Sequence, residues 1–380
     1  MADSDFPLIK AYQLKGVDVT VLIEMDPRSV KTTLFNIKKQ VHKTTIFPSI
    51  TYTELKFYEQ YMDMSKIYIL NRTSSRKLSW SYYKSSWLIH RFIMKGRFNV
   101  VHATGFVGVE RVILYRMIKP WITTVHDPIP HSGGGNREKK DANRVKMLEW
   151  SDGIVLLNEN QKMAFCNKYN VKPNKVLINH LGVYDWMKLF VPKDAKQDPY
   201  NILFFGRIQT YKGLEYLCEA MQIVRKEIPQ ATLTIAGSGK IYFNINPYLR
   251  QGFIKLYNRY IAVEELAAFL YNCALCVCPY TDATQSGVIM TAFALGVPVV
   301  ASDVGGLGEM VEDGKNGFLV PPKNINALAN AIIGLLRNQT LIIQLSANII
   351  EENNNGKRSW SNIANSYLNY YQYLINEKNR

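Results

Sequence analysis

The sequence predicts an α/β protein with doubly wound parallel sheets, and three observations lead to this prediction. Short apolar segments typical of buried strands alternate with segments of helical pattern along most of the 380 residues. The apolar segments of the second half end in glycine-rich or polar turns, and parallel sheets bind their ligands at the edge where such turns lie. The chain is also long enough for two domains with separate hydrophobic cores.

The first half of the chain is expected to hold one early helix, five strands and a charged helix. The early helix covers residues 8–14, and residues 28–98 mix helical and irregular segments rich in Lys and Tyr. A flexible glycine-rich loop is expected over 129–136, followed by the charged helix over 137–150. The expected strands cover residues 16–23 with their turn, 99–105, 121–128, 153–157 and 175–179.

The second half is expected to contain four buried strands, with a short helix before the last of them. Ser286 and Gly287 open that helix, and Gly296 ends it. A polar segment with two prolines, residues 192–199, is the expected linker between the halves. The expected strands cover residues 202–205, 233–237, 274–278 and 299–302, and a final Tyr-rich helix covers 360–374.

Residues 203–213 join the first strand of the second half to the helix that follows it. The strand ends at Gly206, and the turn carries two cations, Arg207 and Lys212. Because such a turn lies at the carboxyl edge of a parallel sheet, it presents both cations and open backbone amides to a ligand. Two fixed positive charges suit a diphosphate. The alternative, from this segment alone, is an ordinary turn with surface cations.

Composition excludes several other classes of protein. Five cysteines do not indicate a disulfide framework, and Cys273, Cys276 and Cys278 are expected to be core residues rather than metal ligands. No run of 18 apolar residues predicts a spanning helix, and the N-terminus lacks the pattern of a secretory signal, so we expect a cytoplasmic protein. The net charge is +15, yet no motif typical of nucleic-acid binding accompanies it.

One basic segment, residues 75–98, contributes to this charge. It holds six Lys or Arg, six interleaved aromatic residues and no acidic residue. Cations beside interfacial aromatics are typical of an amphipathic helix that lies on an anionic membrane. The alternative is a helix packed on the sheet with a solvated basic face, and the two can hold together. We therefore expect a protein that is peripheral to the inner face of the membrane.

Motifs in residues 200–325 resemble the donor domain of a retaining glycosyltransferase of family 4, glycosyl transferases group 1, which has the GT-B fold. The resemblance rests on Gly-Arg-x4-Lys-Gly at 206–213 and on Ala-x-Ala-x-Gly-x-Pro-Val-Val-Ala-Ser at 292–302. It implies two Rossmann-like doubly wound domains that face a cleft. Their expected boundaries are an acceptor-side domain over 1–191, a linker over 192–199, a donor domain over 200–355 and a helix over 356–380 that packs back on the first domain.

The resemblance also implies roles for single residues. Arg207 and Lys212 would stabilise the leaving diphosphate, and His126, at a strand end, would contact the donor sugar. The amides of Gly287 and Val288 would add the dipole of a helix N-terminus. No acidic pair lies at a strand end in a metal-binding context, so neither a metal nor a cofactor is expected. The residues expected to bind the donor are Gly206, Asp282, Ser286, Gly287, Val288, Thr291 and Glu309.

Each of these roles has a structural alternative, and the chain departs from the family pattern. His126 is equally well a structural histidine, and Glu309 a helix N-terminal acid. Two glutamates eight residues apart flank the helix start in the family, whereas this chain has Ala283 and Thr291. Asp282 replaces the first glutamate if the turn is shifted by one residue, and Thr291 offers one weaker hydrogen bond to the ribose. The family's opening strand is expected to be absent or very short.

The sequence therefore predicts a metal-independent, hexosyltransferase-type enzyme. It would move a sugar from a nucleotide sugar to a lipid-linked or polysaccharide acceptor in polysaccharide biosynthesis, on an anionic membrane surface and without nucleic acid. The alternative is a noncatalytic GT-B partner protein of a glycan assembly pathway, which the departures from the family pattern favour. The donor base, the sugar, the acceptor and the linkage stay open at this point.

Overall fold

The computed structural model describes residues 2–28, 34–37, 41–77, 79–105, 111, 120–129 and 137–378. The chain divides into two compact units. Unit 1 consists of Met1–Pro128, Gly134–Asn179 and Ile363–Arg380, and unit 2 of Ile129–Gly133 and His180–Asn362. The expected linker, residues 192–199, falls within unit 2, where the amide of Asp198 donates to the carbonyl of Asn272 at 2.7 Å.

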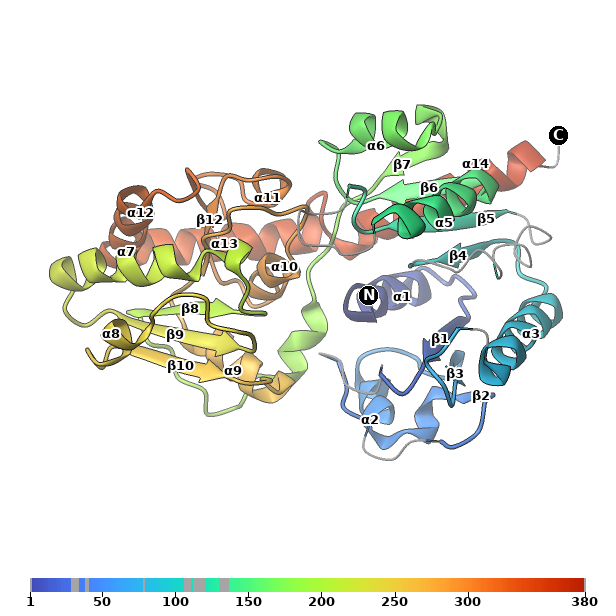
Figure 1. Ribbon diagram of the computed structural model, residues 1–380, viewed down its shortest axis with the longest axis horizontal. Helices are drawn as coiled ribbons and strands as arrows, with labels where there is room; N and C mark the ends of the chain where they lie inside the picture. The colour runs from blue at the N-terminus through green and yellow to red at the C-terminus, as the bar shows by residue number, and fades with distance from the viewer. Residues whose placement is uncertain are drawn as a thin grey trace. The chain divides into compact units, whose positions relative to one another are not determined.

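Unit 2 is built on a six-stranded, all-parallel sheet in the order β10-β9-β8-β11-β12-β13. Strands β10, β9 and β8 lie side by side in Figure 1. Chain order runs outward in both directions from the β8–β11 pair, so the order reverses there, as in a dinucleotide-binding sheet. All four predicted strands of this half are confirmed within two residues. The strands are β8 (Asn201–Phe205), β9 (Thr232–Gly237), β10 (Ile254–Asn258), β11 (Leu275–Cys278), β12 (Val299–Ser302) and β13 (Gly317–Val320).

The central strand β8 is apolar along four of its five residues because helices cover both faces of a parallel sheet. Helix α7 buries a stripe at helical spacing, from Leu214 through Leu217 and Met221 to Val224, and packs against α12 (Figure 1). The helical elements of unit 2 are η4 (Asp185–Phe190), η5 (Thr210–Lys212), α7 (Leu214–Glu227), α8 (Asn246–Leu249), α9 (Val263–Asn272), α10 (Gly287–Ala294), α11 (Leu307–Met310), α12 (Ile325–Arg337) and α13 (Gln339–Asn355).

Unit 1 contains two separate sheets. One is four-stranded and parallel, in the order β4-β5-β6-β7, and the other has β3 between parallel β1 and antiparallel β2. The predicted strands of this half are confirmed, although most are shorter than expected. They are β1 (Val21–Met25), β2 (Thr45–Pro48), β3 (Ile67–Asn71), β4 (Val101–Ala103), β5 (Trp121–Val125), β6 (Gly153–Leu156) and β7 (Val176–Ile178), of which β2 and β3 lie within the segment read as mixed helix and loop.

The helices of unit 1 include the basic segment of the sequence. Helix α3 packs on β2 and β3 (Figure 1). Helix α1 begins six residues earlier than predicted, and α14 ends four residues later. The helical elements are α1 (Ala2–Leu14), η1 (Ser49–Thr51), α2 (Thr53–Lys56), η2 (Phe57–Gln60), α3 (Trp80–Gly96), α5 (Arg137–Trp150), α6 (Lys162–Tyr169), η3 (Pro173–Lys175) and α14 (Trp360–Lys378).

Within unit 1, a buried series of hydrogen bonds connects α14 to α1, β4 and β5. The hydroxyl of Tyr371 lies 3.0 Å from the hydroxyl of Tyr12 and 2.6 Å from Nδ1 of His102, and Nε2 of His102 lies 2.7 Å from the hydroxyl of Thr124. Burial lowers the pKa of His102 to about 3, so this histidine is neutral at physiological pH and bonds as a structural group.

The five cysteines are all buried and unpaired, as the sequence predicts for core residues. Within the described residues there is no group of His, Cys, Asp and Glu arranged to hold a metal ion. The same part of the chain has no helix with the length and apolarity needed to span a bilayer.

Candidate active site

The candidate site of unit 2 lies at the point where the strand order reverses. Strands β8 and β11 are neighbours, and each ends in a segment that the sequence singled out. Gly206 and Arg207 follow β8, and residues 282–287 follow β11. Because ligands of open parallel sheets bind beside such a reversal, the fold brings the two predicted segments to one place.

The backbones of these two segments lie in close contact. The amide of Thr281 donates to the carbonyl of Tyr211 at 2.8 Å. Gly213 has φ +65°, and a Cβ at this position would lie 1.9 Å from the carbonyl oxygen of Pro279. A Cβ on Gly206 would lie 3.3 Å from the side chain of Val288, at the start of α10. Glycine is therefore required at 213 by both conformation and space.

Lys212 is a half-buried cation with an aromatic neighbour on the β11 segment. Its Nζ lies 3.6 Å from the centroid of the Tyr280 ring and 5.2 Å from that of Tyr211. Burial, together with nearby Arg207, lowers the pKa of Lys212 to about 8. In the described part of the chain no carboxylate forms an ion pair with Lys212 or Arg207. Both charges therefore remain available to an anionic ligand.

The N-terminus of α10 adds a dipole beside these cations. Ser286 is the N-cap, and its hydroxyl accepts a bond from the amide of Ile289 at 3.4 Å. Gly287 and Val288 form the first turn, where backbone amides have no partner within the helix. Thr291 is buried and its hydroxyl donates to the carbonyl of Gly287 at 2.7 Å. That hydroxyl can still accept a hydrogen bond from a ligand, but its proton is engaged.

The remaining predicted donor residues lie on neighbouring turns of unit 2. Asp282 precedes the buried Ala283, whose carbonyl accepts a bond from the amide of Gly306 at 3.4 Å. The turn that leads to Glu309 in α11 is thereby held against the β11 segment. The carbonyl of Glu309 accepts a hydrogen bond from the buried guanidinium of Arg358, which fixes the position of α11.

His126 belongs to unit 1, whereas the other nine predicted site residues belong to unit 2. It follows β5 directly, and its Nε2–H donates to the carbonyl of Thr104 at 3.0 Å. Burial lowers the pKa of His126, although the bond to Thr104 and the nearby carboxylate of Asp127 act in the opposite direction. A neutral ring with this bond keeps Nδ1 as an acceptor. Of the predicted loop 129–136, all but Ile129 lies outside the described residues.

Sequence reasoning missed the aromatic residues that surround Lys212. Tyr280 is completely buried, and its hydroxyl has no hydrogen-bond partner in the described residues. Another aromatic residue, Tyr184, lies at the start of α10, because a Cβ on Gly287 would be 3.1 Å from its hydroxyl. The position of Tyr280, two residues beyond the end of a buried strand, is a signal that would have found it.

Comparison with known proteins finds a family match for the part of the chain that holds this arrangement. Residues 199–338 match the family described as glycosyl transferases group 1. A glycosyltransferase of Methanocaldococcus jannaschii, itself uncharacterized, is 26% identical over 331 residues, covering 78% of this chain and 82% of the relative.

Two solved structures resemble the fold over nearly the whole chain. Sucrose-phosphate synthase from Thermosynechococcus elongatus aligns with a TM-score of 0.65 and 20% identity, over 97% of this chain and 92% of that one. Anabaena HepE, solved in complex with UDP and glucose, aligns with a TM-score of 0.62 and 14% identity, over 93% of this chain and 100% of that one. Residues 199–338 therefore carry the signature of glycosyl transferases group 1, and the chain as a whole has the GT-B fold of the solved structures that it resembles.

Proposed function

We propose that the chain is a retaining, metal-independent hexosyltransferase that moves a sugar from a nucleotide sugar to a lipid-linked or polysaccharide acceptor. The observation that carries the proposal is the pair of cations, Arg207 and Lys212, without carboxylate partners in the described residues, beside the N-terminus of α10. Transfer from a nucleotide sugar expels a diphosphate, whose developing charge these groups would meet. HepE, which binds UDP, supports a nucleotide sugar as donor.

The test is a panel of sugar nucleotides, each incubated with the protein in excess chelator while release of nucleoside diphosphate is followed. We expect release from one or a few donors at a rate that chelator leaves unchanged. A rate that falls in chelator and returns with Mg²⁺ or Mn²⁺ would contradict metal independence. The anomeric configuration of the product, read by NMR, tests retention.

One observation favours a noncatalytic partner protein as the second candidate. The positions of the family's two glutamates hold Ala283, which is buried, and Thr291, whose hydroxyl proton bonds within α10. The carboxylate closest in sequence is Asp282. If Asp282→Asn leaves donor hydrolysis unchanged, this carboxylate does not contact the sugar. If no donor of the panel is hydrolysed, the noncatalytic candidate replaces the leading one.

Donor binding should weaken as the pH rises above 8. The pKa of Lys212 is lowered to about 8, so this side chain loses its charge in the free protein from that pH upward. If only the charged form holds the diphosphate, affinity falls about tenfold for each further pH unit. Titration calorimetry with UDP from pH 6.5 to 9.5 measures this affinity. If Lys212 takes up a proton on binding, the binding enthalpy depends on the buffer. Lys212→Arg, which stays charged, should flatten the profile.

The membrane proposal rests on the two faces of α3. One face is buried along Ser81, Ser85, Ile89 and Ile93. The other carries large apolar side chains that are more than half exposed, with Trp80 81% exposed. They recur at intervals of three, four and seven residues, so they share one side of the helix. These exposed residues are Trp80, Tyr83, Trp87 and Met94.

Basic residues accompany this exposed face, and the guanidinium of Arg91 lies 5.3 Å from the centroid of the Trp87 ring. Aromatic rings at the headgroup level with cations beside them suit an anionic lipid surface. The buried face suits a helix packed on the sheet and the exposed face suits a helix on an anionic membrane, so both interpretations of residues 75–98 can hold together. We propose that α3 holds the enzyme at a membrane where its acceptor lies.

Neutralising the basic residues of α3 and of the segment just before it should release the protein from anionic vesicles. Each cation near such a surface contributes about 1 kcal/mol at low salt, so we expect binding to fall at least about tenfold. The substitutions are Arg76→Gln, Lys77→Gln, Lys84→Gln, Arg91→Gln and Lys95→Gln.

Sedimentation with phosphatidylserine vesicles at low and high salt measures the effect. A matched control removes five exposed charges from unit 2, by Lys226→Gln, Arg250→Gln, Lys255→Gln, Lys323→Gln and Arg337→Gln. If both variants lose vesicle binding equally, the net charge of the protein explains the binding and α3 has no specific role. Binding that resists both salt and substitution would leave α3 an ordinary packed helix.

A further inference from the structure

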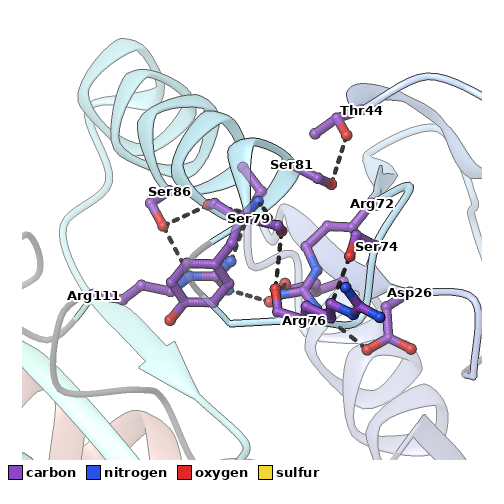
Figure 2. Close-up of polar contacts among 12 residues, drawn as sticks. Asp26, Thr44, Arg72, Ser74, Arg76, Ser79, Ser81, Ser86 and Arg111 are labelled. Atoms are coloured by element: carbon purple, nitrogen blue, oxygen red, sulfur yellow. Dashed lines mark hydrogen bonds and ion pairs between the residues drawn. The ribbon is translucent and has the colours of Figure 1, made fainter.

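A second cluster of charged residues lies in unit 1, at the carboxyl ends of the parallel strands β1 and β3. Glu24 is near the end of β1 and Asp26 follows it, while Arg72 follows β3. Figure 2 shows Arg72 and Asp26 together, with Arg111 on the other side of the cluster beside Ser86. None of these residues belongs to the donor site in unit 2.

The charged groups form one continuous chain of ion pairs. The carboxylate of Glu24 bridges Arg72, at 3.1 Å, and Arg111. The carboxylate of Asp26 bridges Arg72, at 3.3 Å, and Arg28, at 2.8 Å. Three guanidinium groups thus face two carboxylates, which leaves one net positive charge. Burial alone would raise the pKa of Asp26, but hydrogen bonds from Arg28 and the charges of Arg28 and Arg72 lower it, so this carboxylate is ionised.

The inner part of this series of ion pairs is almost completely removed from water. Arg72 is 7% exposed and Arg111 is 5% exposed, and both lie over the ring of Tyr82, at 5.3 and 4.3 Å from its centroid. Arg111 is well satisfied by Glu24, Ser85 and Ser86. Arg72 is not, because its Nε–H is buried and has no hydrogen-bond partner among the described residues. A charged donor in that state costs stability unless a ligand accepts its bond.

The neighbouring backbone also favours an anion. Arg72 opens the turn from β3 to α3, a turn at the carboxyl edge of a parallel strand pair. Helix α3 is 17 residues long, and Ser79 is its N-cap, with its hydroxyl accepting a bond from the amide of Tyr82 at 3.2 Å. The amide of Thr73 donates to the hydroxyl of Ser81 at 3.0 Å, so the first turn of this helix lies beside the residue that follows Arg72, and its dipole adds positive potential there.

We propose that this arginine cluster, Arg28, Arg72 and Arg111 with Glu24 and Asp26, binds a phosphate group of the acceptor. A phosphate oxygen accepts the orphaned Nε–H of Arg72, and the anion neutralises the excess charge. Arg28 stands at the outer end of the series of ion pairs. Because it is 73% exposed, it can turn from Asp26 toward the ligand. Guanidinium groups match phosphate geometry better than ammonium groups do. The proposal rests on the proposed function, since it names the acceptor class for that reaction.

The first experiment measures phosphate binding without turnover. Inorganic phosphate is titrated into Lys212→Ala protein, whose donor site is weakened, and followed by 31P NMR at low ionic strength, where screening is small. Adding Arg72→Lys, which keeps the charge but removes Nε, should weaken binding about tenfold. Adding Arg28→Gln should also weaken it. Arg337→Gln, which removes an exposed ion-paired arginine of unit 2, is the matched control and should leave binding unchanged.

Circular dichroism first establishes that each variant is folded. Arg72→Lys risks unfolding because it disturbs a buried ion pair, and the exposed Arg28 then decides the outcome on its own. Loss of phosphate affinity in Arg28→Gln or Arg72→Lys, with the control unchanged, supports the site even if no sugar nucleotide is hydrolysed. Affinity equal to that of the Lys212→Ala parent in every folded variant overturns it.

The second experiment uses the full-length protein with an active donor and compares acceptors with and without phosphate. A soluble sugar phosphate and a polyprenyl phosphate in micelles present the same group from two sources. Arg28→Gln should raise KM about tenfold for the source that is the acceptor and leave KM for the donor unchanged. Equal KM values with and without the phosphate group, from both sources, would overturn the assignment to the acceptor.

Discussion

Replacing Lys212 by alanine is expected to lower kcat by about a hundredfold or more while the protein stays folded. The side chain lies 3.6 Å from the Tyr280 ring and forms no ion pair with a described carboxylate, so its removal breaks no salt bridge that stabilises the fold. The variant has no ammonium group at this position to stabilise the negative charge that develops on the leaving diphosphate in the transition state. Arg207→Ala should act in the same direction.

Initial rates with the donor found in the panel measure this effect. Lys226→Ala is the matched control, because Lys226 is exposed in the last turn of α7, about 20 Å from the residues that begin this helix. It should leave kcat unchanged. Near-normal rates in both Lys212→Ala and Arg207→Ala would show that neither cation stabilises the leaving group. A higher KM at unchanged kcat would assign them to binding of the ground state instead.

Gly213→Ala is expected to lower the free energy of unfolding by about 2–5 kcal/mol and to impair catalysis. Two costs combine at this position. A non-glycine residue with φ near +65° is strained by about 1–2 kcal/mol, and a Cβ only 1.9 Å from the carbonyl oxygen of Pro279 forces the β8 and β11 segments apart. Because Lys212 directly precedes Gly213, that movement displaces the cation from Tyr280. Urea unfolding and kcat measure the two effects.

Gly314→Ala separates the strain of the backbone from the clash. Gly314 has φ +72° in the same unit, and a Cβ there meets nothing within 4 Å. It should show the backbone strain alone, with catalysis unaffected. If both variants lose equal stability and Gly213→Ala keeps full activity, the close approach of the two segments does not matter for the site.

Four of the six strands of the unit 2 sheet, β8, β9, β11 and β12, were predictable because burial on both faces requires consecutive apolar residues. A strand such as β8, buried on both faces, must be apolar along nearly its whole length, and the turn after it must be polar to reach a ligand. The segments ending at Gly206 and beginning at Ser286 are therefore recognisable from neighbouring residues alone. The same holds for the cysteines, whose apolar neighbours indicate burial.

Unit 1 was less predictable because its stabilising contacts are distant in sequence. Strands β2 and β3 are short and lie in a segment with mixed patterns, so local preference did not separate them from loops. The pairing of Glu24 with Arg72 and Arg111 joins positions 48 and 87 residues apart, and no local pattern indicates it. Likewise the two faces of α3 follow from its packing on β2 and β3, which left Trp80 and Trp87 exposed.

The amino-acid order alone thus determined the α/β class, four of the six strands of the unit 2 sheet and the two cations at its carboxyl edge. These features depend on the burial and chemistry of consecutive residues. Folding added the ring of Tyr280 over Lys212, the lowered pKa of that lysine and the buried arginine cluster of unit 1. Each of these depends on how far apart two segments lie once packed, and that distance sets desolvation and charge coupling.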